Sequence, residues 1–136
     1  MVIVDTSVWI DYLVGTTNPE TVWLDREMGR QRIGLTDLIL CEVLQGIRSD
    51  RAFRQTRLEL LKYHVFDTGG EELAVAAASN YRRLRVMGHT VRKTIDCLIA
   101  SHCLATGNFL LHRDRDFEPF EQHLGLHVMH PESTLT

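Results

Sequence analysis

The chain has 136 residues, which suits a single domain with its own hydrophobic core and requires no disulfide or structural metal for folding. Its three cysteines, Cys41, Cys97 and Cys103, lie among apolar residues without CxxC spacing, and we expect reduced core thiols in a cytoplasmic protein. We expect no membrane segment and no signal peptide, and the net charge of −3 argues against a broadly basic nucleic-acid-binding surface.

The N-terminal stretch predicts a buried strand that ends at a carboxylate. The apolar run Val2–Val4 stops at Asp5, and a helical apolar pattern continues to Leu13. Asn18 followed by proline then predicts a capped helix over 19–30. A strand that delivers an acid to its end is typical of a ligand site in an open parallel sheet.

The middle of the chain predicts two further helices and a second strand. A short segment at 32–35 leads to Thr36, a good N-cap for a helix over 37–47. A charged amphipathic helix is expected over 50–62, followed by a strand over 63–66. The residues expected to face inward from that amphipathic helix are Phe53, Leu58 and Leu61.

The C-terminal half continues the alternation of helices and strands. It predicts a long helix over 71–87, an apolar helix over 94–105, a strand over 109–111 and a short last strand over 127–129. The predicted fold class is therefore α/β, with a parallel sheet of four to five strands and helices on both faces.

Four acidic residues stand where this layout leaves little reason for one. They are Asp5 at a strand end, Glu42 within an apolar helix, Asp96 in the first turn of the most apolar helix, and Asp114 after a strand. Each acid also has an ordinary explanation. The charge of Asp96 interacts favourably with the positive N-terminal end of its helix, and Glu42 lies at the edge of an amphipathic face. Asp114 and Asp116 are acids of a solvated loop.

Taken together, the acids indicate a cation site, because strand ends and helix starts of a parallel sheet meet at one edge. Each pair of like charges about 4 Å apart costs on the order of 4 kcal/mol at an effective dielectric constant of 20, so the cluster must take up protons or bind a cation. Oxygen ligands without an organised set of Cys or His favour Mg²⁺ or Mn²⁺ over zinc. With these five acids set aside, the rest of the chain carries two more basic than acidic residues.

Four separated motifs give the sequence a family resemblance. They are VIVDTSVWIDYL at the N-terminus, TDLILCEVLQGIR around Glu42, TVRKTIDCLIASHCLA around Asp96, and LLHRDRDF with Asp114. In this order and at these intervals, they resemble PIN-domain ribonucleases, and among them the VapC-type toxins of bacterial toxin-antitoxin pairs. The resemblance covers nearly the whole chain and implies a single PIN-like nuclease domain over 1–136.

The resemblance also implies an activity and its partners. It implies a Mg²⁺- or Mn²⁺-dependent endoribonuclease that acts on structured RNA, commonly transfer or ribosomal RNA, restrained by a VapB-type antitoxin and forming a homodimer. Water would displace the 3′ oxygen of a phosphodiester and leave a 5′ phosphate.

By position, the acidic quartet would be Asp5, Glu42, Asp96 and Asp114, with Asp116 as a further ligand or supporting acid. Ser7, or else Thr6, would hydrogen-bond a ligand or a bound water. His112 departs from the family, in which a small hydroxyl residue is common at this position; it is either an ordinary loop residue or a substrate contact.

RNA binding needs cations beside the acids. Four basic residues are close in sequence and are candidates for phosphate contacts: Arg92, Lys93, Arg113 and Arg115. The alternative is that they are ordinary solvated charges.

Two other functions compete with this interpretation. A haloacid-dehalogenase-like phosphohydrolase also begins with a strand ending in aspartate, but it usually carries a second aspartate where this chain has Ser7. A degenerate domain that binds RNA or protein without cutting is the second alternative, although all four acids are present.

Overall fold

A four-stranded parallel sheet forms the centre of the molecule. The computed structural model describes residues 1–132, and residues 133–136 of the predicted single domain lie outside the described part. The strands are β1 (Val2–Val4), β2 (Ile33–Thr36), β3 (His64–Phe66) and β4 (Phe109–Leu111), in the order β3-β2-β1-β4. The α/β class and the parallel sheet predicted from the sequence are confirmed.

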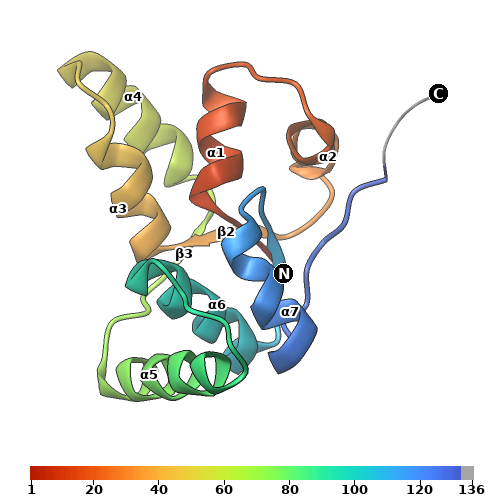
Figure 1. The fold of residues 1–136 in the computed structure, drawn as a ribbon. Helices are drawn as coiled ribbons and strands as arrows, with labels where there is room; N and C mark the ends of the chain where they lie inside the picture. The colour runs from red at the N-terminus through yellow and green to blue at the C-terminus, as the bar shows by residue number, and fades with distance from the viewer. Residues whose placement is uncertain (133–136) are drawn as a thin grey trace.

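Helices cover both sides of this sheet (Figure 1), with α1 and α4 on one side of the strands and α5 and α6 on the other. In the described residues the helices are α1 (Thr6–Leu13), α2 (Pro19–Glu27), α3 (Asp37–Gln45), α4 (Asp50–Leu60), α5 (Glu71–Val86), α6 (Thr94–Thr106), the 3-10 turn η1 (Arg115–Phe117) and α7 (Glu118–Leu124). No helix within residues 1–132 has the length and apolar character needed to cross a bilayer.

Side-chain caps explain where the early helices begin. The Asn18 carboxamide accepts from the backbone N–H of Thr21, whose hydroxyl accepts from the Asn18 N–H, and Pro19 occupies the first turn of α2. The Thr36 hydroxyl accepts from the N–H of Ile39 at the start of α3. These helix starts are confirmed as the sequence predicts them.

The segment at 32–35 is more than a connection, because it forms the inner strand β2. Gly34 is the reason that β2 packs closely against β3: a Cβ here would lie 3.0 Å from the backbone oxygen of His64 and 2.9 Å from the sulfur of Met1. The last predicted strand, 127–129, is reduced to a single parallel bridge between Leu110 and Val128.

Two other sequence-based expectations are wrong. Phe53 and Leu58 on α4 and Leu61 at its end are exposed, and Leu60 is the residue that faces the core instead. Cys41 is exposed, whereas Cys97 and Cys103 are buried thiols as expected.

The strand order places the ligand edge between β1 and β4. The chain leaves β1 towards β2 on one side, and β4 returns on the other side of β1 after α5 and α6. Such a switch in strand order leaves an opening at the carboxyl ends of the two strands. Asp5 follows β1 directly, and Asp114 lies three residues beyond β4.

Candidate active site

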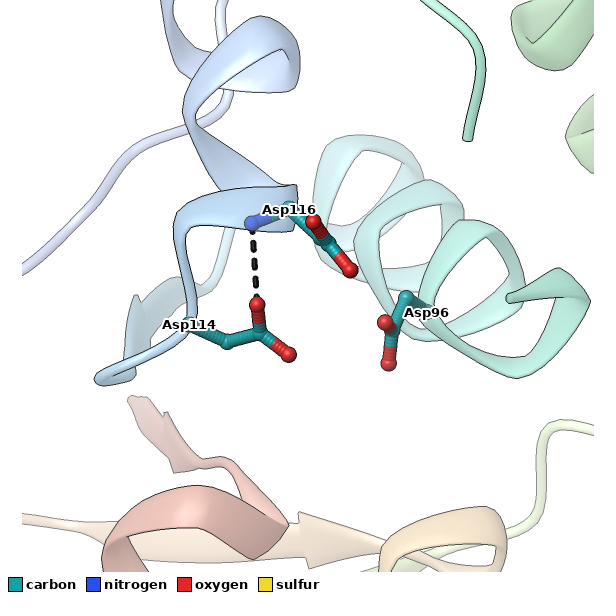
Figure 2. Close-up of side chains that lie close together, drawn as sticks. All are labelled: Asp96, Asp114 and Asp116. Atoms are coloured by element: carbon teal, nitrogen blue, oxygen red, sulfur yellow. Dashed lines mark hydrogen bonds between the residues drawn. The ribbon is translucent and has the colours of Figure 1, made fainter. Parts of the chain in front are cut away.

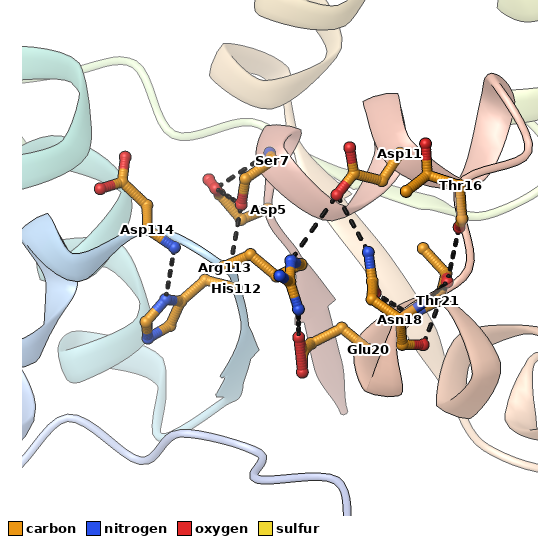
Figure 3. Close-up of polar contacts among 10 residues, drawn as sticks. All are labelled: Asp5, Ser7, Asp11, Thr16, Asn18, Glu20, Thr21, His112, Arg113 and Asp114. Carbon is orange, nitrogen blue, oxygen red and sulfur yellow. Dashed lines mark hydrogen bonds and ion pairs between the residues drawn. The ribbon is translucent and has the colours of Figure 1, made fainter. Parts of the chain in front are cut away.

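Asp5 is held at the start of α1 by its own capping interaction. Its buried carboxylate accepts from the Ser7 hydroxyl at 2.7 Å and from the Ser7 backbone N–H at 3.1 Å. The same hydroxyl accepts from the backbone N–H of Arg113 at 3.1 Å, which joins the end of β4 to the end of β1 (Figure 3). Ser7 therefore fixes the carboxylate and links the two loops that border the site.

Thr6 fixes the second acid of the predicted quartet. Its hydroxyl donates to the Glu42 carboxylate at 2.7 Å, so that the side chain from α3 is held against the N-terminus of α1. Both hydroxyl residues singled out from the sequence thus contact an acid, Ser7 contacting Asp5 and Thr6 contacting Glu42.

Three carboxylates from two distant segments converge beside this pair. Asp96 in the first turn of α6 faces Asp114 at the start of η1 and Asp116 within η1 (Figure 2), and one oxygen from each lies within 4.8 Å of the others. The Asp114 carboxylate also accepts from the backbone N–H of Asp116 at 2.9 Å. We call Asp96, Asp114 and Asp116 the acidic trio.

The burial of two acids makes the site electrostatically costly when it holds no cation. Burial, with the negative charges of Asp5 and Asp114 added, raises the pKa of Asp96 to about 7, although Lys93 opposes this shift. Burial also raises the pKa of Asp5 to about 6, against the hydrogen bonds from Ser7. The charge of Glu42 raises the pKa of both groups, so the quartet shares one electrostatic neighbourhood.

One carboxylate oxygen of the acidic trio lacks a hydrogen-bond partner, which also favours a bound cation. Asp96 Oδ2 is buried and has no hydrogen-bond partner among residues 1–132. A buried carboxylate oxygen without a partner carries a large desolvation cost, which a bound cation would offset. Oxygen donors alone suit Mg²⁺ or Mn²⁺.

His112 supports the turn that carries Asp114. Its Nδ1 accepts from the backbone N–H of Asp114 at 3.1 Å, and its ring packs on Phe117 with centroids 5.0 Å apart. Burial lowers the pKa of His112, which favours the neutral imidazole that this contact requires. The side chain accepts from the backbone two residues further on, as serine, threonine and asparagine do in turns. His112 therefore makes the same kind of contact as the hydroxyl residue that is common at this position in the family.

The four candidate cations have different surroundings. The Arg113 guanidinium turns away from the acids and pairs with Glu20 and, at 3.7 Å, with Asp11 (Figure 3). Arg92 pairs with Asp116 at 3.0 Å, at the exposed side of the acidic trio. Lys93 and Arg115 are exposed beside the same acids.

The arrangement therefore differs from a simple quartet. Asp96 and Asp114 lie together with Asp116 in the acidic trio, whereas Asp5 and Glu42 are held by hydroxyl groups beside the trio at the same sheet edge. The pairing of Arg92 with Asp116 has no signal in the sequence, because the two residues are 24 positions apart on different elements.

Comparison with known proteins identifies the family that this chain resembles. Residues 2–121 match the family described as PIN domain. The chain is 34% identical over 122 residues to VapC ribonuclease Mb1587 of Mycobacterium bovis, covering 87% of this chain and 90% of that protein. Ribonuclease VapC11 of Mycobacterium tuberculosis matches with the same identity and coverage.

Solved structures share the fold at lower sequence identity. VapBC2 from Rickettsia felis, bound to a DNA fragment from its promoter, superposes with a TM-score of 0.74 at 17% identity, over 95% of this chain and 98% of that one. A toxin-antitoxin complex from Klebsiella pneumoniae gives a TM-score of 0.72 at 16% identity, over 98% and 99% of the two chains.

Proposed function

Because the chain belongs to the PIN domain family and, within it, to the VapC ribonucleases, we propose that it is the toxin of a type II toxin-antitoxin pair. It would hydrolyse phosphodiester bonds in structured RNA, such as transfer or ribosomal RNA, in the cytoplasm. The observation that carries this proposal is the convergence of the acidic trio beside Asp5 and Glu42. A cluster of this charge at a sheet edge serves phosphate chemistry when it holds a cation.

The residues that would hold Mg²⁺ or Mn²⁺ are the acidic trio and Asp5. Glu42 would contribute its negative charge beside them. A bound ion of this kind lowers the pKa of a water and neutralises the charge of a phosphate under attack. Ser7 keeps Asp5 ionised and oriented, because its two hydrogen bonds favour the charged carboxylate. The hydrogen bond from the Thr6 hydroxyl orients the Glu42 carboxylate in the same way.

Cations at the rim would guide the RNA backbone to these acids. Lys93 and Arg115 are exposed and flank Asp96 and Asp114 in sequence, so their charges are available to phosphates. Water would attack the phosphorus in line and the 3′ oxygen would depart, which leaves a 5′ phosphate and a 3′ hydroxyl on the products.

Cleavage of labelled total RNA by the purified, antitoxin-free protein tests this activity. Reactions with Mg²⁺, with Mn²⁺ and with chelator are compared for the wild type, Asp5→Asn, Asp96→Asn and the control Asp25→Asn, which changes an exposed acid on α2. We expect discrete metal-dependent cuts with 5′-phosphate ends in the wild type and the control, and none in the two site variants. Cutting that persists in chelator, products with a 2′,3′-cyclic phosphate, or no cutting by folded wild type would overturn the proposal.

We further propose that a VapB-type antitoxin covers an apolar groove formed by α1, α3 and α4. Ile10 and Val14 on its border are 45% and 71% exposed and lie together with Leu13, so that they form one contiguous exposed apolar surface. The groove is lined by Ile10, Leu13, Val14, Val43, Gly46, Ile47, Ala52 and Thr56. An apolar segment of the antitoxin would fill it, and an antitoxin arginine would enter the acidic trio and block the cation.

The partner proposal has its own test, because Val14 lies outside the acids. Val14→Asp should prevent copurification with the antitoxin and leave RNA cleavage intact, whereas antitoxin variants without basic residues should bind but not inhibit. Inhibition that survives loss of those basic residues would contradict the blocking role of arginine. A homodimer is the further assembly that we propose, and sedimentation of the antitoxin-free protein measures it.

A further inference from the structure

Two histidines from different elements meet outside the acidic trio. His89 lies in the connection between α5 and α6, and His123 lies in the last turn of α7. Their Nε2 atoms are 3.1 Å apart, and their ring centroids are 4.8 Å apart with the planes inclined by 36°. Neither residue belongs to the site described above.

A single N–H···N hydrogen bond between the two rings is one explanation of this pair, but the rings depart from the linear geometry that such a bond prefers. Two imidazoles aligned head to head at this nitrogen separation would have ring centres about 5.4 Å apart, and a hydrogen bond prefers that near-linear arrangement. The observed 4.8 Å between centroids shows that the rings are bent away from it.

The nitrogen separation also matches two ligands of one ion. Zinc binds histidine nitrogens at about 2.0–2.1 Å, so two nitrogens 3.1 Å apart subtend an angle of about 95–102° at the ion. This angle lies between the octahedral and the tetrahedral values. The backbone of His89 is held in place by a hydrogen bond, because its N–H donates to the Leu84 carbonyl at 2.8 Å.

We propose that His89 and His123 form a second metal site, which binds one borderline divalent cation such as Zn²⁺, Ni²⁺ or Cu²⁺ with water as the remaining ligands. Imidazole nitrogen selects these ions, whereas the carboxylates of the acidic trio select Mg²⁺ or Mn²⁺. The two sites would therefore take different ions from the same solution.

An ion bound by His89 and His123 would connect the two segments that carry the acidic trio. His89 precedes Asp96 on the segment that enters α6, and His123 follows Asp114 and Asp116 on the segment that leaves β4. An ion shared by the two imidazoles would join these two segments at a second point, in addition to the Arg92–Asp116 ion pair. Binding would thus stabilise the folded chain and brace the acidic trio.

Thermal unfolding with and without Zn²⁺, in saturating Mg²⁺ at pH 7.5, tests the proposal. The variants are His89→Gln, His123→Gln and the control His127→Gln, which removes an exposed imidazole that packs against Phe109 instead. We expect Zn²⁺ to raise the unfolding midpoint by about 4 °C in the wild type and the control, and to leave both pair variants unchanged.

A second measurement avoids dependence on the variants. Substoichiometric Ni²⁺ should broaden the ring signals of His89 and His123 in the NMR spectrum of the wild type before those of other histidines. A Zn²⁺ effect that survives either pair substitution would place the ion elsewhere and overturn the proposal. No effect on the wild type, by either method, would show that the pair is joined by a hydrogen bond alone.

Discussion

The hydroxyl of Ser7 donates a hydrogen bond of 2.7 Å to the carboxylate of Asp5. Because the same oxygen accepts from the backbone of Arg113, the ends of β1 and β4 are joined through one side chain. The hydrogen bonds from Ser7 also lower the pKa of Asp5 against the effect of burial. The ionised state of Asp5 and its position thus depend on a neighbour that would itself hold no metal.

Replacing Ser7 by alanine should reduce RNA cleavage about ten-fold, as loss of a group that orients a metal ligand commonly does. The pKa of Asp5 should rise, so the acidic limb of the pH profile should move to higher pH. Cleavage rates measured between pH 5 and 8 check both effects. Ser7→Thr, which keeps the hydroxyl, should retain most of the activity, and equal losses in the two variants would contradict the role assigned to this hydrogen bond.

Asp96 predicts an unusual dependence of stability on pH. Its pKa is about 7 in the folded protein, above its ordinary value of 3.8, so the folded state binds more protons than the unfolded state between these values. In chelator, the free energy of unfolding should therefore fall as the pH rises from about 4 to 7. Denaturant unfolding of the wild type across this range measures the slope.

Asp96→Asn separates this charge effect from folding defects. In chelator at pH 7.5, the variant should be more stable than the wild type by about 1 to 3 kcal/mol, because it removes a buried charge. Mg²⁺ should stabilise the wild type and leave the variant nearly unchanged. A variant less stable than the wild type in chelator would contradict the electrostatic strain inferred at this site.

Arg113 and Arg115 should behave differently although they are two residues apart. Arg115→Ala should weaken RNA binding, and it should reduce the dependence of log affinity on log salt by about 1 without affecting stability. Arg113→Ala should instead cost up to about 1 kcal/mol of stability, because its guanidinium pairs with Glu20 and Asp11. Filter binding of RNA in an Asp96→Asn background and denaturant unfolding distinguish the two effects, and interchangeable phenotypes would contradict them.

His112 should act by accepting one hydrogen bond. His112→Ala removes the acceptor for the Asp114 N–H and should weaken Mn²⁺ binding about ten-fold. His112→Asn offers a carboxamide oxygen that makes the same two-residue turn, and should restore most of the affinity. If asparagine rescues nothing, the packing on Phe117 matters more than the hydrogen bond.

The sequence predicts elements where local signals and tertiary packing agree. The cap at Asn18 and the strand over 109–111 are of this kind, and both are confirmed. Strand β2 lacks a strong signal because Gly34 interrupts its apolar run, although the close approach of β3 is what requires glycine. The short helix α7, which the sequence analysis does not predict, depends on the packing of buried Phe117 and Phe120.

The inward face of α4 could not be found from periodicity alone. Its apolar residues predict a buried stripe, yet Leu58 is 65% exposed, because the chain contains no element that covers this face within residues 1–132. The acids were predicted individually, but the division into an acidic trio and a hydroxyl-held pair depends on rotamers and on contacts such as Thr6–Glu42. Such contacts between distant residues have no signature in one sequence.

The most direct test of the central claim is a titration of the metal-free protein with Mn²⁺, followed by electron paramagnetic resonance of the free ion. The wild type should bind Mn²⁺ with an affinity that falls as the pH drops below 7, because protons compete for Asp96 and Asp5. Asp96→Asn and Asp114→Asn should lose this binding, and Asp25→Asn should keep it. Undiminished Mn²⁺ binding by folded Asp96→Asn would contradict the assignment of the acidic trio as the metal centre.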